Sequence, residues 1–198
     1  MITVNLKKGQ FGGSSGYRKD FLFKQGKEKA TLICEYYFEK DFDPRLAGKL
    51  FGINSNETCT RIMFRRDKKE DPRYFGAALY VQDYPEQDLS GIPGYKEDKG
   101  YGTNLYQYYF NFRKGAWNYV KLECTMNSIG KADGIIEFQV GRNTIPIKIN
   151  NFIFRRDKKT LFSSILGMVF FGGSSMAYAP LKDETIKIRI LEPKDLIP

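Results

Sequence analysis

Histidine is absent from the 198-residue chain. This absence excludes Ser–His and Cys–His nucleophilic machinery and histidine general bases, and it removes the commonest protein ligand of zinc and iron. Any catalysis would therefore have to use tyrosine, lysine, arginine, aspartate, glutamate or cysteine side chains. We expect no metal site.

Cysteine is scarce as well, since Cys34, Cys59 and Cys124 lie far apart and form no Cys-x-x-Cys pair. An odd number of distant cysteines indicates neither a disulfide framework nor a zinc site, and it favours a reduced, intracellular origin. No window approaches the roughly 20 apolar residues of a membrane span. Residues 1–8 also lack the apolar stretch of a signal peptide. We therefore expect a soluble protein with no membrane partner.

Positive charge is abundant, because 32 lysine and arginine residues exceed 23 aspartate and glutamate residues and give a formal net charge of +9. Such a field attracts polyanions, which include nucleic acid, anionic lipid and acidic sugar chains. The charge alone does not choose among them. The length fits one domain over residues 1–198, with enough chain to bury a core.

Short apolar segments alternate with polar residues and are separated by Gly, Pro, Asn and Asp, which is typical of antiparallel strands. Strands are predicted over Ala30–Phe38, Thr60–Phe64, Ala77–Gln82, Tyr106–Phe112, Trp117–Thr125, Ile135–Val140, Ile145–Ile149, Leu166–Phe171 and Thr185–Leu191. No long segment has helical periodicity, although Lys158–Ser164 is compatible with one helical turn. The pattern predicts an all-β fold of two packed antiparallel sheets, with a long loop over Gln82–Gly102.

The string Phe-Arg-Arg-Asp-Lys-Lys occurs twice, at residues 64–69 and 154–159. We interpret it as a strand end that runs into a basic turn and is used twice, and coincidence is the alternative interpretation.

Residues two apart on a strand share a face, which predicts an exposed surface of arginines beside tyrosines. The residues placed on it by this parity are Cys59, Arg61, Met63 and Arg65 on one strand and Ala78, Tyr80, Gln82 and Tyr84 on the next. Guanidinium groups bind carboxylates in bidentate fashion, and aromatic rings stack on sugar rings. The alternative interpretation is a solvated sheet face with ordinary cross-strand pairs.

Three strings follow one another along the chain. They are Phe-Asp-Pro-Arg-Leu-Ala-Gly-Lys-Leu-Phe-Gly-Ile at residues 42–53, Cys-Thr-Arg-Ile-Met-Phe-Arg at 59–65 and Ala-Leu-Tyr-Val at 78–81. In this order they resemble the Gly-Gly-Lys-Leu-Pro-Gly-Leu, Ser-x-Arg-x-Met-Trp-Arg and Tyr-x-Tyr segments of the fourteenth polysaccharide lyase family, which includes alginate and glucuronan lyases of chlorella viruses and sea molluscs. Gly115-Ala116-Trp117, the turn at 127–134 and Phe-Phe-Gly-Gly-Ser-Ser at 170–175 continue the likeness.

The resemblance implies a concanavalin-like jelly-roll β-sandwich that cleaves uronic-acid polysaccharides by β-elimination, without a metal or organic cofactor. It places Lys49 and Arg61 where they would neutralise the substrate carboxylate, and Tyr80 where a tyrosine would act as acid or base. Cys59, Arg65, Tyr74, Gln82 and Tyr84 are expected to bind substrate. We expect the side chains of Lys49 and Tyr80 to be exposed.

The chain departs from the family pattern at four positions, where Cys59 replaces serine, Phe64 tryptophan, Phe51 proline and Ala78 the first tyrosine. Ala78 removes one hydroxyl of the acid/base pair, and Tyr74 or Tyr84 would have to replace it.

Two other functions are compatible with the sequence. A non-catalytic module or virion structural protein that binds acidic polysaccharide would keep the fold and the basic face without the chemistry. Nucleic-acid binding ranks lower, because no RNA-recognition or oligonucleotide-binding signature is present. We expect a monomer, either carried by a virion and delivered to a host cell wall or otherwise cytoplasmic.

Overall fold

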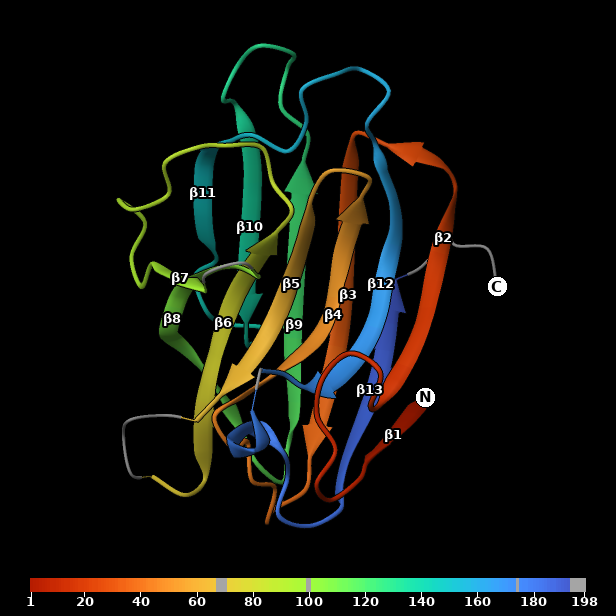
Figure 1. The fold of residues 1–198 in the computed structure, drawn as a ribbon, viewed down its shortest axis with the longest axis vertical. Helices are drawn as coiled ribbons and strands as arrows, with labels where there is room; N and C mark the ends of the chain where they lie inside the picture. Colours follow the sequence, from red (N-terminus) through yellow and green to blue (C-terminus); the bar gives the residue numbers. More distant parts are fainter. Residues whose placement is uncertain (67–70, 99–100, 174, 193–198) are drawn as a thin grey trace.

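The protein is described by a computed structural model that covers residues 1–66, 71–98, 101–173 and 175–192. Within these ranges the chain forms two antiparallel sheets that pack face to face (Figure 1). The six-stranded sheet has the order β1 (Ile2–Leu6), β13 (Glu184–Glu192), β3 (Lys29–Phe38), β9 (Trp117–Thr125), β10 (Gly134–Val140) and β11 (Ile147–Phe152). The seven-stranded sheet has the order β2 (Tyr17–Lys27), β12 (Phe162–Phe171), β4 (Ala47–Ser55), β5 (Cys59–Arg65), β6 (Tyr74–Gln82), β8 (Gly102–Arg113) and β7 (Lys96–Asp98). This architecture confirms the predicted β-sandwich.

The core between the sheets is rich in aromatic rings. In β3, buried residues alternate with half-buried ones, so that Tyr36 and Phe38 point inward with no exposed surface. The ring of Phe38 packs at 4.8 Å from that of Phe75 and at 5.2 Å from that of Phe112. Each buried phenylalanine contributes about 1.5–3 kcal/mol relative to an exposed one. The core therefore needs neither disulfides nor a metal to hold the sheets together.

All nine predicted strands correspond to observed strands, but β1, β2, β4 and β7 were not predicted. In β4 the pairing register shifts between Lys49 and Gly52, so Leu50 and Phe51 both lie in the core. This bulge interrupts the two-residue alternation by which strands are recognised. β7 consists of three exposed residues in the long loop and carries no apolar signal.

The helical turn expected over Lys158–Ser164 is not formed, because β12 already begins at Phe162. Asp157 instead accepts hydrogen bonds from the backbone N–H groups of Lys159 and Thr160, at 2.7 and 3.0 Å, and so closes a tight turn. The helical structure of the described residues is limited to the 3-10 turn η1 (Met176–Tyr178). No helix in these ranges is long and apolar enough to cross a membrane.

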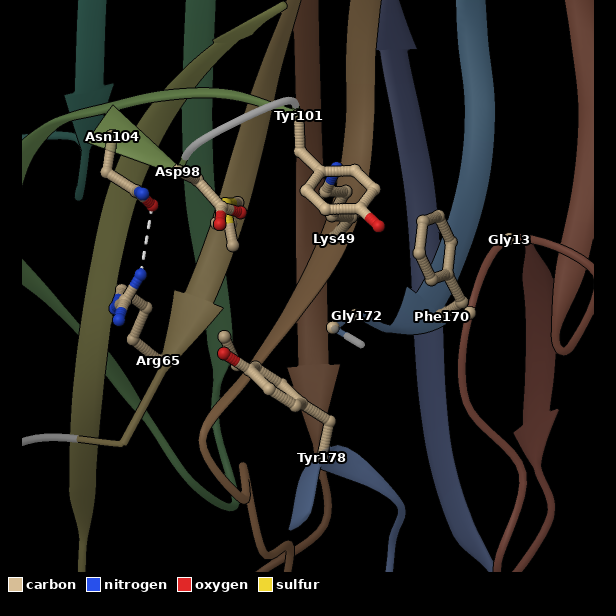
Figure 2. Close-up of a pocket in the computed structure, with 13 residues that line it drawn as sticks. Gly13, Lys49, Arg65, Asp98, Tyr101, Asn104, Phe170, Gly172 and Tyr178 are labelled. Atoms are coloured by element: carbon tan, nitrogen blue, oxygen red, sulfur yellow. Dashed lines mark hydrogen bonds between the residues drawn. The ribbon is translucent and has the colours of Figure 1, made fainter. Parts of the chain in front are cut away.

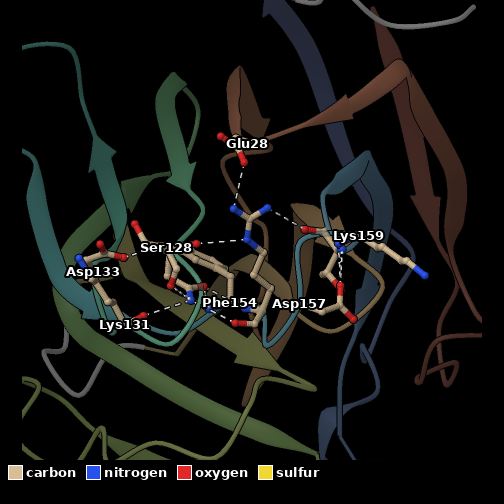
Figure 3. A network of polar contacts seen from close by, with 10 residues as sticks. Glu28, Ser128, Lys131, Asp133, Phe154, Asp157 and Lys159 are labelled. Carbon is tan, nitrogen blue, oxygen red and sulfur yellow. Dashed lines mark hydrogen bonds and ion pairs between the residues drawn. The ribbon is translucent and has the colours of Figure 1, made fainter.

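The second copy of the repeated string lies in a polar network between β11 and β12 (Figure 3). Arg155 is buried and donates hydrogen bonds to the backbone oxygens of Asn127 and Thr160 and to the carboxylate of Glu28, at 3.0–3.2 Å. The side-chain oxygen of Asn127 accepts from the backbone N–H groups of Phe154 and Arg155. The network therefore ties three turns together at one end of the sandwich. In the first copy, residues 67–69 lie outside the described residues.

Three segments lie in front of the outer face of the seven-stranded sheet (Figure 1). The loop over residues 7–16 crosses in front of β12, η1 lies in front of the lower part of the sheet, and β7 extends its edge beyond β8. These segments frame the one region of that face described next.

Candidate active site

A pocket of about 260 Å³ opens on the outer face of the seven-stranded sheet (Figure 2). Its floor is formed by strands β4, β5, β8 and β12. Its rim is formed by the glycine loop at residues 12–13, by η1, and by Asp98 and Tyr101, which we call the β7 region. The lining residues are Gly12, Gly13, Ala47, Lys49, Met63, Arg65, Asp98, Tyr101, Asn104, Phe170, Gly172, Gly173 and Tyr178. The predicted parity of β5 is correct, since Met63 and Arg65 face the pocket while Ile62 and Phe64 lie in the core.

Lys49 is the half-buried amine of this pocket. Its Nζ lies 4.2 Å from the centroid of the Tyr80 ring and donates a hydrogen bond of 3.3 Å to Oε1 of Gln82. Burial and the nearby Arg61 charge lower the pKa of Lys49 to about 8. An amine with such a pKa exists in both protonation states near neutral pH.

Arg61 lies beneath the pocket rather than in its lining, and only 3% of its surface is exposed. The guanidinium donates 3.2 Å hydrogen bonds to the backbone oxygens of Leu50 and Met168 and stacks 5.2 Å from the Phe170 centroid. Gly52 makes room for it, because a Cβ there would overlap the Arg61 side chain and the Thr60 carbonyl. The Nε of Arg61 is buried and has no hydrogen-bond partner. Arg61 thus supplies positive charge to the pocket from below.

Arg65 reaches the pocket at the end of β5. Its Nη1 donates a 2.9 Å hydrogen bond to Oδ1 of Asn104, whose own Nδ2 donates to the backbone oxygen of Lys96. The Nε of Arg65 is also buried without a partner. Buried donors without partners are rare in folded proteins, so the hydrogen-bonding capacity of this guanidinium is not filled by the described residues.

Tyr80 was expected to be exposed, and this expectation is wrong. Its side chain has no exposed surface, and its hydroxyl lies 3.4 Å from Oδ2 of Asp98. Burial and the Asp98 carboxylate raise the pKa of Tyr80 well above its ordinary value. The ring lies against the Lys49 amine and packs in a small apolar cluster with Ala47, Met63 and Ala78.

Two other predicted residues lie next to this centre. Gln82 bridges Lys49 to the β7 region, because its Nε2 donates a 2.8 Å hydrogen bond to the backbone oxygen of Tyr101. Cys59 is buried two residues before Arg61 on β5, and burial raises the pKa of its thiol to about 11. It is therefore a neutral thiol near neutral pH and does not line the pocket.

Tyr74 and Tyr84 also lie outside the pocket lining. Tyr74 begins β6 and packs beside Arg73. Tyr84 follows Asp83, whose φ of 51° bends the chain after β6, so the parity of the strand ends there. Its hydroxyl lies 2.7 Å from Oγ1 of Thr103 and its ring packs on Phe152.

Sequence reasoning missed several lining residues. Those with polar or aromatic side chains are Asp98, Tyr101, Asn104, Phe170 and Tyr178. Tyr178 comes from η1, about a hundred residues after β6 in the chain. Asp98 and Tyr101 belong to the long loop that the sequence singled out, which was the available signal for them. Among the described residues, no group of three or more Cys, Asp or Glu side chains is arranged to hold a metal ion.

The two-sheet jelly-roll fold is similar to those of solved polysaccharide lyases, including the following three. An alginate lyase from Aplysia kurodai has a TM-score of 0.78 and 20% identity over 95% of this chain and 80% of that one. The alginate lyase vAL-1 from Chlorella virus has a TM-score of 0.75 and 20% identity, covering 95% and 81%. An endo-β-1,4-glucuronan lyase from Trichoderma reesei has a TM-score of 0.56 and 11% identity, covering 95% and 77%.

A family model assigns the chain more closely. The model for polysaccharide lyase 14 matches residues 2–189, so the chain belongs to polysaccharide lyase family 14. A search of curated proteins found no match.

Proposed function

We propose that this protein cleaves a uronic-acid polysaccharide, of the glucuronan or alginate type, by β-elimination. The observation that carries the proposal is the gathering of three cations, since Lys49 and Arg65 line the pocket and the buried Arg61 lies beneath it. The Nε of Arg65 has no partner, and a uronate carboxylate in the pocket would pair with this guanidinium. Family membership and the alginate and glucuronan lyases among the similar structures support the same substrate class.

The reaction needs a cation at the carboxylate. The C5 proton of a uronate is weakly acidic, and positive charge beside the carboxylate stabilises the enolate-like charge that develops when the proton leaves. We assign this role to Arg65, which reaches the pocket, with Arg61 acting through its field from below. Guanidinium groups keep their charge at every working pH, so this assistance does not depend on protonation state.

The reaction also needs a base for the C5 proton. We assign the role of base to Lys49, which the resemblance had placed as a cation that neutralises the carboxylate. The amine of Lys49 is half-buried and lies near the like charge of Arg61, and it has no carboxylate within salt-bridge distance among the described residues. The electron pair of the C5–H bond then forms the C4=C5 double bond while the C4–O bond breaks. Tyr80 supports Lys49 from beneath and holds Asp98.

The proposal is tested by incubating the protein with glucuronan, alginate and whole algal wall while following the ultraviolet absorbance of the unsaturated product. We expect a rise on at least one substrate, and about 10³-fold less for Lys49→Met, which keeps the length of the side chain but removes the base. No rise on any substrate across pH 6–10 would overturn the lyase proposal.

A non-catalytic module that binds acidic polysaccharide is the second candidate. Ala78 favours it, because this small residue leaves β6 without a hydroxyl between Gly76 and Tyr80, and the Tyr80 hydroxyl faces Asp98. This candidate predicts saturable binding of glucuronan or alginate by the wild-type protein without unsaturated product.

A further inference from the structure

Elimination leaves an oxygen atom that must receive a proton, and the pocket contains a hydroxyl suited to give it. Tyr178 lines the pocket from η1, and its ring packs on the cluster of Ala47, Met63, Ala78 and Tyr80. In Figure 2 its hydroxyl points into the pocket, toward the side where Arg65 lies and away from Phe170. The ring thus packs on the same cluster to which Ala78 of β6 belongs.

The turn that carries Tyr178 is held in place by a dedicated anchor. Arg45 donates hydrogen bonds from Nε to the backbone oxygen of Ala179, at 3.0 Å, and from Nη2 to that of Ala177, at 3.3 Å. Arg45 has a φ of 49°, a left-handed conformation that costs a non-glycine residue about 1–2 kcal/mol. Such strain persists where surrounding contacts fix it, and here the contacts fix the position of η1.

Gly173 provides the second constraint on Tyr178. Its φ is 143°, and a Cβ at this position would overlap the Tyr178 ring. The backbone therefore approaches the ring face closely, which locks the ring between Gly173 and the apolar cluster. A hydroxyl on a fixed ring is preorganised for proton transfer.

The other tyrosine hydroxyls in or near the pocket are less suited to donate this proton. Tyr80 is buried against Asp98, while Tyr74 and Tyr84 do not line the pocket. Tyr101 does line it, but 60% of its surface is exposed, and its hydroxyl points toward Phe170, away from Arg65 (Figure 2).

We propose that Tyr178 is the proton donor of the elimination, placed in the pocket by the Arg45 anchor. This inference rests on the proposed function. As the C4–O bond breaks, the bonding pair stays on the glycosidic oxygen, which takes the hydroxyl proton of Tyr178. Lys49 has by then accepted the C5 proton. Transfer of one proton from Lys49 back to the tyrosinate, directly or through solvent, restores the starting state.

The first test uses Tyr178→Phe, with Tyr101→Phe as the matched control. Phenylalanine keeps the packing against Gly173 and removes only the hydroxyl. We expect kcat on the cleaved polysaccharide to fall about 10²–10³-fold in Tyr178→Phe, and the Kd for that polysaccharide and the Tm to stay close to wild type. We expect Tyr101→Phe to retain most of the activity.

The second test asks what the hydroxyl does. A uronide that carries 4-nitrophenoxide at C4 has a leaving group that needs no protonation, so the defect of Tyr178→Phe should largely disappear on it. Arg45→Met, which releases η1 without touching the pocket, should lower kcat on the polysaccharide and be relieved on the nitrophenyl substrate in the same way. A purely structural role of Arg45 would slow both substrates equally.

The outcomes separate the two proposals. Full activity of Tyr178→Phe on the polysaccharide, a comparable loss in Tyr101→Phe, or an equal defect on both substrates would overturn the assignment of Tyr178 while leaving the lyase proposal intact. If the wild-type protein forms no unsaturated product at all, both proposals fall.

Discussion

Arg65 and Arg155 occupy the same position in the two copies of Phe-Arg-Arg-Asp-Lys-Lys, and their surroundings differ completely. Arg155 has Nε, Nη1 and Nη2 all bonded, to two backbone oxygens and to Glu28. Among the described residues, Arg65 has one side-chain hydrogen bond, to Asn104, and its buried Nε has no partner. Both follow a phenylalanine that is fully buried in the core. The same string thus gives one arginine whose three nitrogens are all bonded within the protein and one arginine at the pocket whose Nε has no partner.

The difference lies in what faces each guanidinium. Around Arg155 the chain brings two turns whose carbonyls point inward, and Asn127 fixes their geometry (Figure 3). Around Arg65 the strands β4 and β8 present Ala47 and Asn104, and the remaining space is the pocket (Figure 2). A guanidinium has five donors, so an incomplete set of protein acceptors leaves binding capacity for an anion.

Of the variants that compare the two arginines, Arg65→Met should have the largest effect, and that effect is on activity. Removing the guanidinium should lower kcat/KM on the cleaved polysaccharide about 10²–10³-fold, because the carboxylate loses its charged partner. Arg65→Lys should recover only part of this, since lysine lacks the fork that binds a carboxylate in bidentate fashion. Steady-state kinetics measure both variants, and unchanged kcat/KM in Arg65→Met would remove Arg65 from the site.

The reciprocal experiment is Arg155→Met, which should act on stability. It leaves the buried carbonyls of Asn127 and Thr160 without their donor, and each unsatisfied group costs about 1–3 kcal/mol. We expect about 3 kcal/mol less free energy of unfolding, measured with urea. Arg65→Met should change the same quantity by under about 1 kcal/mol, because the part of the chain that the structure describes would lose one hydrogen bond, to Asn104. Equal losses in the two variants would show that the two arginines contribute equally to the free energy of unfolding, despite their different partners.

A smaller effect is expected from pH, and it separates Lys49 from the arginines. Lys49 has its pKa lowered to about 8 in the folded protein, so its amine becomes neutral as pH rises through that value. As a base it should make kcat/KM of the free enzyme rise about tenfold per pH unit below 8 and level off above it. Guanidinium groups keep their charge across this range. A fall of kcat/KM through pH 8 with no rise below it would instead indicate that Lys49 acts as the carboxylate cation.

The smallest effect is expected for Cys59→Ser, which restores the serine that the family pattern has at this position. The thiol is buried and neutral, since burial raises its pKa to about 11. We expect kcat/KM to change less than about threefold and the wild-type thiol to resist alkylation at pH 7. Rapid labelling of Cys59 together with loss of activity would place the thiol in the site after all.

The strands could be predicted from sequence where side chains alternate, as in β3 and β9, because a half-buried strand imposes a two-residue period. β4 could not, since its bulge places Leu50 and Phe51 on the same side. The parity of β5 correctly put Arg65 on the outer face, whereas that of β6 failed at Tyr84, where a positive φ at Asp83 turns the chain. The alternation of side chains along one strand does not predict where a bulge or a turn interrupts that strand.

The sequence by itself determined the sandwich class, the excess of positive charge, the exclusion of histidine chemistry and the likeness to a lyase family, because composition and strand periodicity are local properties. Tertiary structure decided which cations keep free donors, that Tyr80 is buried against Asp98, and that Tyr178 enters the pocket in front of β6. These facts depend on how turns far apart in the chain meet over the sheet. Two identical strings therefore gave arginines with different partners, since the partners come from elsewhere in the fold.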